Sequence, residues 1–205
     1  MALVTVSNNS LTAVTALPAS IPTGALTLIK SITASSSASI SFVDGASGVV
    51  LDDTYKSYIF KFINIHPASN SQFYFNVSID GGSNYNVAKT STYFLAVHAE
   101  GDAESALIYN TTGDLAQGTG DQRISFDFIN DNDSNLGGSM QLFSPADTTF
   151  VKHFICQTQH MQGDPASNNV FAAGYANTTS AINAVKFNMA SGNIDSGIIK
   201  LYGVL

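Results

Sequence analysis

Short runs in which apolar and polar side chains alternate recur along this chain, and they restrict it to β-structure. Residues 185–189 read Val-Lys-Phe-Asn-Met. A period of two places successive side chains on opposite faces of a strand, so that one face is buried and the other is not. Residues 191–193, Ser-Gly-Asn, have turn chemistry, and the alternation resumes at 199–202. Residues 185–205 therefore predict two strands joined by a glycine-rich turn.

Similar runs, separated by turn signals, predict strands throughout the rest of the chain. They cover residues 25–32, 38–43, 57–65, 71–79, 85–87, 93–97, 123–129, 138–143, 149–159 and 170–176. Both faces of 57–65 are largely apolar, which predicts a central strand that is buried on both sides. Residues 67–70 then predict a hairpin loop between 57–65 and 71–79. Residues 103–108 fit a helix of at most two turns, and they fit a strand as well.

This spacing of short strands predicts an all-β fold, an antiparallel β-sandwich of jelly-roll type, in one domain over residues 24–205. Parallel α/β folds are excluded, because no helical pattern of crossover length is present. Period-two placement predicts a core that includes Ile40, Phe42, Phe60, Phe62, Phe73, Phe75, Val77, Leu142, Phe154, Phe187 and Leu201.

Residues 1–23 differ from the body. A strand is conceivable over 11–17, but Pro18 and Pro22 interrupt it and impose an extended path. Such an arm either attaches to a partner or lies along the body as an edge strand, and the sequence favours neither. It lacks the basic region and long apolar run of a signal peptide. No segment of the chain has the length of apolar sequence that a transmembrane helix needs. We expect synthesis in the cytoplasm and no membrane insertion.

Charge is sparse in this chain. Only 11% of the residues are charged, against 44% hydrophobic, and the net charge is −7. Clustered Lys and Arg, which binding to nucleic-acid phosphates requires, are missing, since the lysines and the single Arg123 are scattered. A surface that relies on Ser, Thr and Asn suits a protein in a permanent assembly, and equally an abundant secreted protein. Cys156 is the only cysteine, and we expect a buried, inert thiol.

Metal-binding patterns are weak. His66, His98, His153 and His160 lie on separate elements and show no zinc-ligand spacing. One loop carries oxygen ligands at alternate positions, Asp131, Asp133 and Asn135, and loosely resembles the start of a calcium loop. It has Leu where an EF-hand has its glycine and its glutamate. Capping of a turn by Asp and Asn side chains is the competing interpretation.

Catalytic patterns are weaker still. The sequence has no G-x-S-x-G elbow, no supported Cys–His pair and no glycine loop leading into a helix. Its carboxylates occur singly or in turns, as in any acidic β protein. We therefore expect no enzyme activity and no cofactor. Tyrosines at 55, 74, 93, 109 and 175 could stack on sugars, but cross-strand packing explains most of them equally well.

Four segments carry a resemblance to a known class of protein: 58–67, 82–90, 149–154 and the ending 191–203. Together they resemble virion structural proteins of tailed bacteriophages, notably those of marine and cyanobacterial phages. The similarity covers about residues 25–205, and the ending is its most specific part. The resemblance implies a particle component without catalytic residues, usually a tail-fibre or other tail-appendage subunit. A capsid decoration protein is the closest alternative, and a module that binds host surface glycans is a third.

We also expect self-association. Apolar residues in Ser/Thr/Asn-rich strands, sparse charge and the lack of disulfides favour closed symmetry that covers strand edges. The candidate contacts are Leu201, Val204 and Leu205, which alternatively close the core of a monomer. The choice of a homotrimer comes from the family resemblance. Residues 1–23 are the candidate contact with other virion proteins.

Overall fold

The computed structural model describes residues 26–163 and 165–205. Regular structure in this part of the chain is entirely β-strand, and no helix that could cross a membrane occurs in it. The predicted arm over 1–23, its boundary with the body and the possible strand at 11–17 lie outside the described residues.

Twelve strands follow one another in these residues. They are β1 (Leu26–Ser37), β2 (Ile40–Val43), β3 (Ser57–Pro67), β4 (Phe73–Ser78), β5 (Lys89–Ala99), β6 (Ser105–Tyr109), β7 (Gln122–Arg123), β8 (Leu136–Phe143), β9 (Lys152–Gln162), β10 (Ala166–Ala176), β11 (Ala184–Met189) and β12 (Ile194–Val204).

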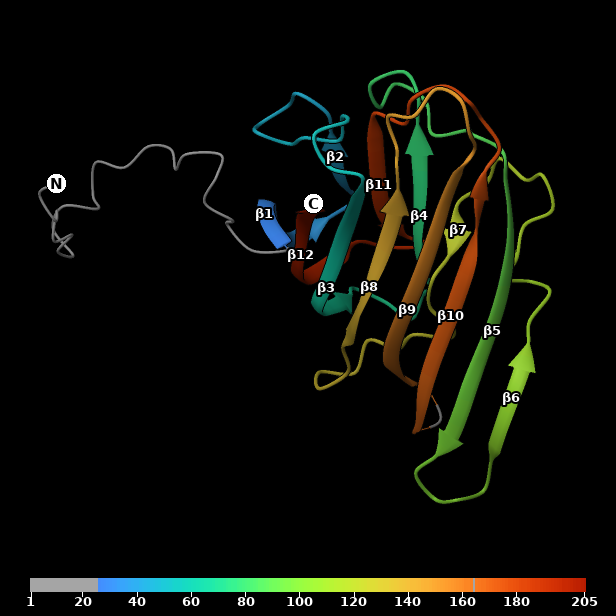
Figure 1. The fold of residues 1–205 in the computed structure, drawn as a ribbon. Helices are drawn as coiled ribbons and strands as arrows, with labels where there is room; N and C mark the ends of the chain where they lie inside the picture. Colours follow the sequence, from blue (N-terminus) through green and yellow to red (C-terminus); the bar gives the residue numbers. More distant parts are fainter. Residues whose placement is uncertain (1–25, 164) are drawn as a thin grey trace, which may run out of the picture.

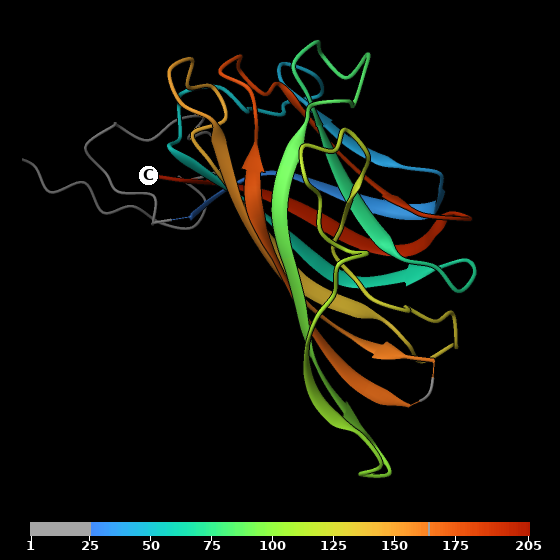
Figure 2. The same ribbon diagram turned by 90° about the vertical axis from the view of Figure 1, so that its right-hand side faces the viewer.

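The strands form two antiparallel sheets that pack face to face, so the predicted sandwich is confirmed. The large sheet has eight strands in the order β1-β12-β3-β8-β9-β10-β5-β6, and the small sheet has four in the order β2-β11-β4-β7 (Figure 1). Figure 2 shows the strong twist of the large sheet, in which β5 runs steeply down the view and β1 runs across it. The jelly-roll connectivity stays a prediction.

The predicted hairpin over 67–70 is wrong, because the chain changes sheets there. β3 pairs with β12 and β8, whereas β4 pairs with β11 and β7. Both strands carry large aromatic side chains on one face. Side by side in one sheet they would form a single apolar row, but on facing sheets the two rows pack against each other. The turn over 191–193 likewise carries the chain from β11 in the small sheet to β12 in the large sheet.

For four other segments, the structure corrects the prediction or decides between two alternatives. Residues 103–108 take the strand alternative, as β6. Strand structure over 123–129 is confined to its first residue, because the chain there crosses between sheets and Phe128 bridges both Ser71 and Gln162. Residues 85–87 are not strand. β3 is an inner strand but is not buried on both sides, since Lys61 and Ile63 on its outer face are exposed.

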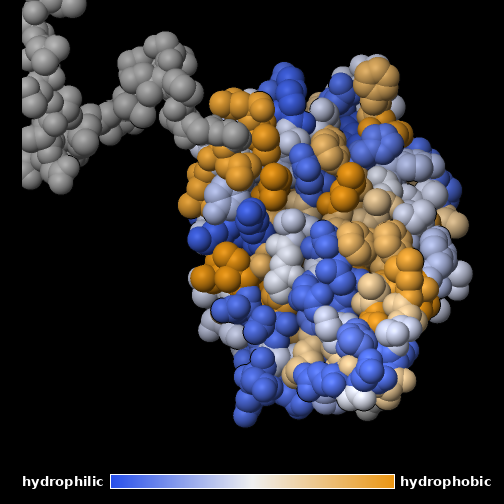
Figure 3. Space-filling model, turned by 60° about the horizontal axis from the view of Figure 1, so that its bottom comes forward, coloured by the Kyte–Doolittle hydropathy of each residue, from blue (hydrophilic) through white to orange (hydrophobic). Residues whose placement is uncertain are grey.

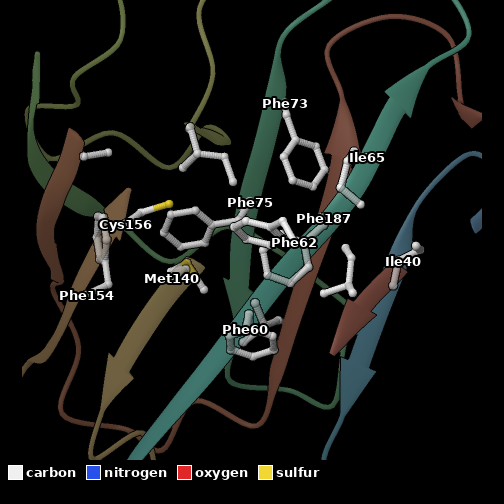
Figure 4. Close-up of a cluster of buried hydrophobic side chains, with 14 of the residues drawn as sticks. Ile40, Phe60, Phe62, Ile65, Phe73, Phe75, Met140, Phe154, Cys156 and Phe187 are labelled. Carbon is white, nitrogen blue, oxygen red and sulfur yellow. The ribbon is translucent and has the colours of Figure 1, made fainter. Parts of the chain in front are cut away.

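The core lies between the sheets, and all eleven predicted core residues are buried in it. Phe187 on β11 is at its centre (Figure 4). Its ring lies 5.2 Å from the ring centroids of both Phe60 and Phe62 across the sheet interface. Within its own sheet the ring stacks on Phe73 at 5.9 Å. Cys156 is buried in the same cluster, as predicted, and burial raises the pKa of its thiol and keeps it unreactive.

Two glycines explain part of the distinctive ending of the sequence. Gly197 has a φ of 120° at a point where the register of β12 against β3 shifts, and a Cβ there would lie 2.6 Å from the main-chain oxygen of Asn64. A Cβ at Gly203 would lie 2.4 Å from the ring of Tyr55. Both positions require glycine, because β12 is packed so closely against its neighbours that a side chain would not fit.

We predict that Phe187→Ala lowers the free energy of unfolding by about 3–5 kcal/mol, since it removes a ring that contacts both sheets and leaves a cavity. Urea unfolding followed by tyrosine fluorescence measures the change. Phe150→Ala is the control, because that ring is 70% exposed. Equal effects of the two substitutions would contradict a central position for Phe187.

Candidate functional site

The predicted calcium ligands lie in the loop before β8, at the end of the sandwich where β3 ends. Asp131, Asp133 and Asn135 are all exposed. The main-chain oxygen of Asp131 accepts the amide of Ser134 at 2.8 Å and lies 3.1 Å from Nε2 of His66. The loop therefore contains a turn, but both of these hydrogen bonds use the main chain of Asp131, so the competing interpretation of side-chain capping stays a prediction.

Two of the three predicted calcium ligands lie close together. Asp133 and Asn135 line a polar hollow of about 340 Å³, together with His66 and Asp195, while Asp131 is not among its lining residues. Within residues 26–163 and 165–205, no three His, Cys, Asp or Glu side chains form a group that could hold a metal ion. Calcium binding by this loop stays a prediction.

A larger hollow of about 640 Å³ opens on the other side of the same loop. Its walls come from the ends of β5 and β9 and the starts of β8 and β10, and they include His98, Glu100, Asp133 and Gln159. His98 lies 3.1 Å from Asp102, but both side chains are exposed.

His160 lies at the base of this hollow and is buried. Its Nε2 contacts the main chain of Phe126, and its Nδ1 has no hydrogen-bond partner among the described residues. Burial lowers the pKa of His160 to about 4. The folded protein therefore holds a neutral imidazole at physiological pH.

The opposite end of the sandwich contains a cluster of polar side chains that we call the lysine cluster: Asn76, Lys89, Asp121, Lys186 and Asn188. Asn76 on β4 pairs in register with Lys186 on β11, so the two share the outer face of the small sheet. Asp121 directly precedes β7, on the other side of β4. Its carboxylate accepts Nδ2 of Asn188 at 3.0 Å and lies 3.8 Å from Nζ of Lys186.

Lys89, the first residue of β5, is completely buried. Its Nζ donates to Oδ1 of Asn76 at 2.6 Å and to the main-chain oxygen of Val87 at 2.9 Å. The pKa of Lys89 is lowered to about 8, chiefly by burial; the charge of Asp121 opposes this change and that of Lys186 adds to it. About a tenth of the amine is therefore uncharged at pH 7, far more than for an ordinary lysine.

The amide of Asn76 is held in one orientation. Its Oδ1 accepts hydrogen bonds from Nζ of Lys89 and from the amide of Val77, the latter at 2.9 Å. Its Nδ2 donates to the main-chain oxygen of Tyr85 at 2.7 Å and to Oδ1 of Asp121 at 2.8 Å. A flipped amide would place its nitrogen against two donors and its oxygen against two acceptors.

A second buried lysine provides a comparison. Lys152 on β9 and Lys89 on β5 both pair with Ala176 of β10, so they lie at the same end of the large sheet. The Nζ of Lys152 donates to main-chain oxygens of Phe150 and Thr178, at 2.9 and 3.2 Å. Of the two lysines, only Lys89 donates a hydrogen bond from its amine to a side-chain amide.

The three predicted interface residues differ in their surroundings. Leu201 is completely buried, so it takes the alternative of closing the core of its own chain. Val204 is half-buried and Leu205 is 77% exposed. These two remain available for a contact between subunits.

The lysine cluster was not among the sites predicted from the sequence. A signal was present, because Lys89 alternates with Ser91, Tyr93 and Leu95 on the buried face of β5. A lysine in phase with core residues needs a polar partner inside the protein. Asn76 alternates with the core residues Phe75 and Val77 and so falls on the outer face of β4, but nothing in the spacing shows that other residues cover that face.

We predict that the protein loses stability as the pH falls from about 6.5 to about 4, and that this loss is much smaller in His160→Gln. In that window the unfolded chain protonates His160 while the folded chain keeps it neutral, so lower pH favours unfolding. Urea midpoints across the range measure the effect. Asp80, whose pKa is lowered to about 2 by hydrogen bonds from Ser78 and Asn84, contributes equally to both proteins. His153→Gln on the exposed face should keep the native profile, and a pH-independent native protein would contradict the prediction.

Comparison of the chain with models of protein families, with curated proteins and with solved structures found no match.

Proposed function

We propose that this chain is a structural subunit of a tailed-phage virion, most specifically of a tail fibre or another tail appendage. The sequence resemblance supports this class. Its most specific segment, 191–203, forms the sheet-changing turn and most of β12. That strand pairs with both β1 and β3 and so joins β1 to the rest of the large sheet. The segment with the most specific resemblance is therefore a central structural element of the fold.

The observation that carries an assembly function is a set of exposed apolar side chains at one end of the large sheet, which we call the β1 edge. Leu26, Leu28 and Leu205 are 43%, 51% and 77% exposed, and Leu26 pairs in register with Val204. β1 is the terminal strand of this sheet within the described residues. An edge strand with unpaired backbone groups and apolar side chains favours contact with another chain.

One face of the molecule has a mixed surface. Figure 3 shows hydrophobic residues in separate patches, with hydrophilic residues between them. On the outer face of the large sheet, Phe94 and Phe171 stack with ring centroids 4.9 Å apart, near the exposed Ile155. Exposed apolar side chains of this kind favour a surface that is covered by another chain. We propose that copies of the chain associate through the β1 edge as a homotrimer, and that residues 1–23 contact other virion proteins.

We predict that an antibody against the folded domain labels the tails of intact phage particles in immunogold electron microscopy. Label on heads alone would support the capsid decoration alternative and exclude the tail. Unlabelled intact particles, together with labelled lysate protein, would contradict both virion locations. A glycan-binding module that is not part of the particle would then be the remaining reading.

We predict that the full chain sediments as a trimer at micromolar concentration and that Leu28→Asp shifts it to the 21.6 kDa monomer. A carboxylate at the β1 edge would have to be desolvated in the interface, which is unfavourable. Leu107→Asp is the matched control, because Leu107 is also exposed but lies on β6 at the opposite end of the sheet. A native chain that sediments as a monomer would contradict self-association.

A further inference from the structure

Three groups of the lysine cluster have the arrangement that an amide exchange between side chains needs. The buried amine of Lys89 contacts the amide of Asn76 at 2.6 Å, and that amide contacts the carboxylate of Asp121 at 2.8 Å. The amine is a nucleophile, the amide carbon is an electrophile, and the carboxylate lies against the amide nitrogen. These side chains come from β4, from β5 and from the residue before β7, so the fold brings them together from three separate segments.

We propose that Lys89 and Asn76 become joined by an intramolecular isopeptide bond between Nζ and Cγ, with Asp121 as the catalytic carboxyl group and ammonia as the leaving group. The reaction converts an amine and a primary amide into a secondary amide and ammonia. It requires no oxidant, reductant or co-reactant. Release of ammonia into solvent drives it to completion.

The bond changes balance within the three groups. The lone pair of the uncharged Lys89 amine forms the Nζ–Cγ bond, and the carbonyl electron pair moves to Oδ1. Asp121 carries a proton from Nζ to Nδ2, after which the Cγ–Nδ2 bond breaks and ammonia leaves. The carbonyl double bond then re-forms. One carboxyl group acts first as base and then as acid, so it is unchanged at the end.

The surroundings favour each part of this sequence. Complete burial lowers the pKa of Lys89, which supplies the uncharged amine that the attack requires. The amide of Val77 donates to Oδ1 at 2.9 Å and would stabilise the negative charge that develops there. Holding the amine and the amide together removes most of the entropic barrier of a reaction between two side chains.

The position of the two residues gives the bond a mechanical consequence. Asn76 lies near the end of β4 in the small sheet, and Lys89 begins β5 in the large sheet. The end of β4 and the start of β5 lie at the upper end of the sandwich in Figure 1, joined by the loop over 79–88. A covalent link would close that loop and tie the two sheets together directly.

The experiment is mass analysis of the purified full chain. We expect an intact mass below the sequence mass by one ammonia molecule. Trypsin should not cleave after Lys89, because the amine that it recognises is lost. Further cleavage before Asp80 opens the loop, and the segments that contain Asn76 and Lys89 should remain joined. An intact mass equal to the sequence mass, with cleavage after Lys89, would overturn the proposal.

Substitutions test the separate contributions of Lys89 and Asp121 to bond formation. Lys89→Arg and Asp121→Asn should both retain the full sequence mass, and Asp121 is partly exposed, so its replacement is compatible with folding. Lys186→Met is the matched control, since Lys186 lies beside the same carboxylate but should be dispensable for the bond. Lys152 is an internal control and should be cleaved by trypsin in every protein. Complete bond formation in Asp121→Asn would overturn the catalytic assignment of Asp121.

Discussion

Packing of phenylalanine side chains between two sheets of unequal width is the constraint on which the rest of this structure depends. Phe187 contacts aromatic rings of both sheets and holds the four-stranded sheet over the middle of the eight-stranded one. The small sheet ends at β7, which is only two residues long. The large sheet continues beyond it, so the inner face of β5 needs another cover.

Polar residues supply that cover. Beyond Tyr93 the buried face of β5 carries Ser91 and Lys89, and the loop over 113–121 lies against them. Ser91 donates to the buried side chain of Gln122 at 2.6 Å, and Lys89 donates to Asn76. These hydrogen bonds give the buried amine of Lys89 and the buried hydroxyl of Ser91 polar partners, as burial of such groups requires. The lysine cluster is thus the polar continuation of the aromatic core at the point where one sheet stops.

The sequence is sufficient to predict the layers of this fold but not their connections. Period-two alternation identifies which side chains point inward, and for this reason Phe60, Phe73 and Phe187 were placed in the core correctly. Alternation does not show which strands are neighbours in a sheet. A short loop after β3 is compatible with a hairpin and with a step to the opposite sheet, and only the packing of both aromatic rows selects the step. The buried amine–amide contact depends on that choice, so it could not be read from spacing.

The interior position of β12 sets an order on folding during synthesis. This strand lies between β1 and β3, which are made more than a hundred residues earlier, and it pairs with both along their length. Until β12 has been synthesised, β1 has no partner in the large sheet among the described strands, and β3 lacks its neighbour on one side. Pairing across such a distance along the chain is slow, because a long loop must close first. The nascent chain therefore passes through a state with open strand edges, in which chaperone binding competes with aggregation.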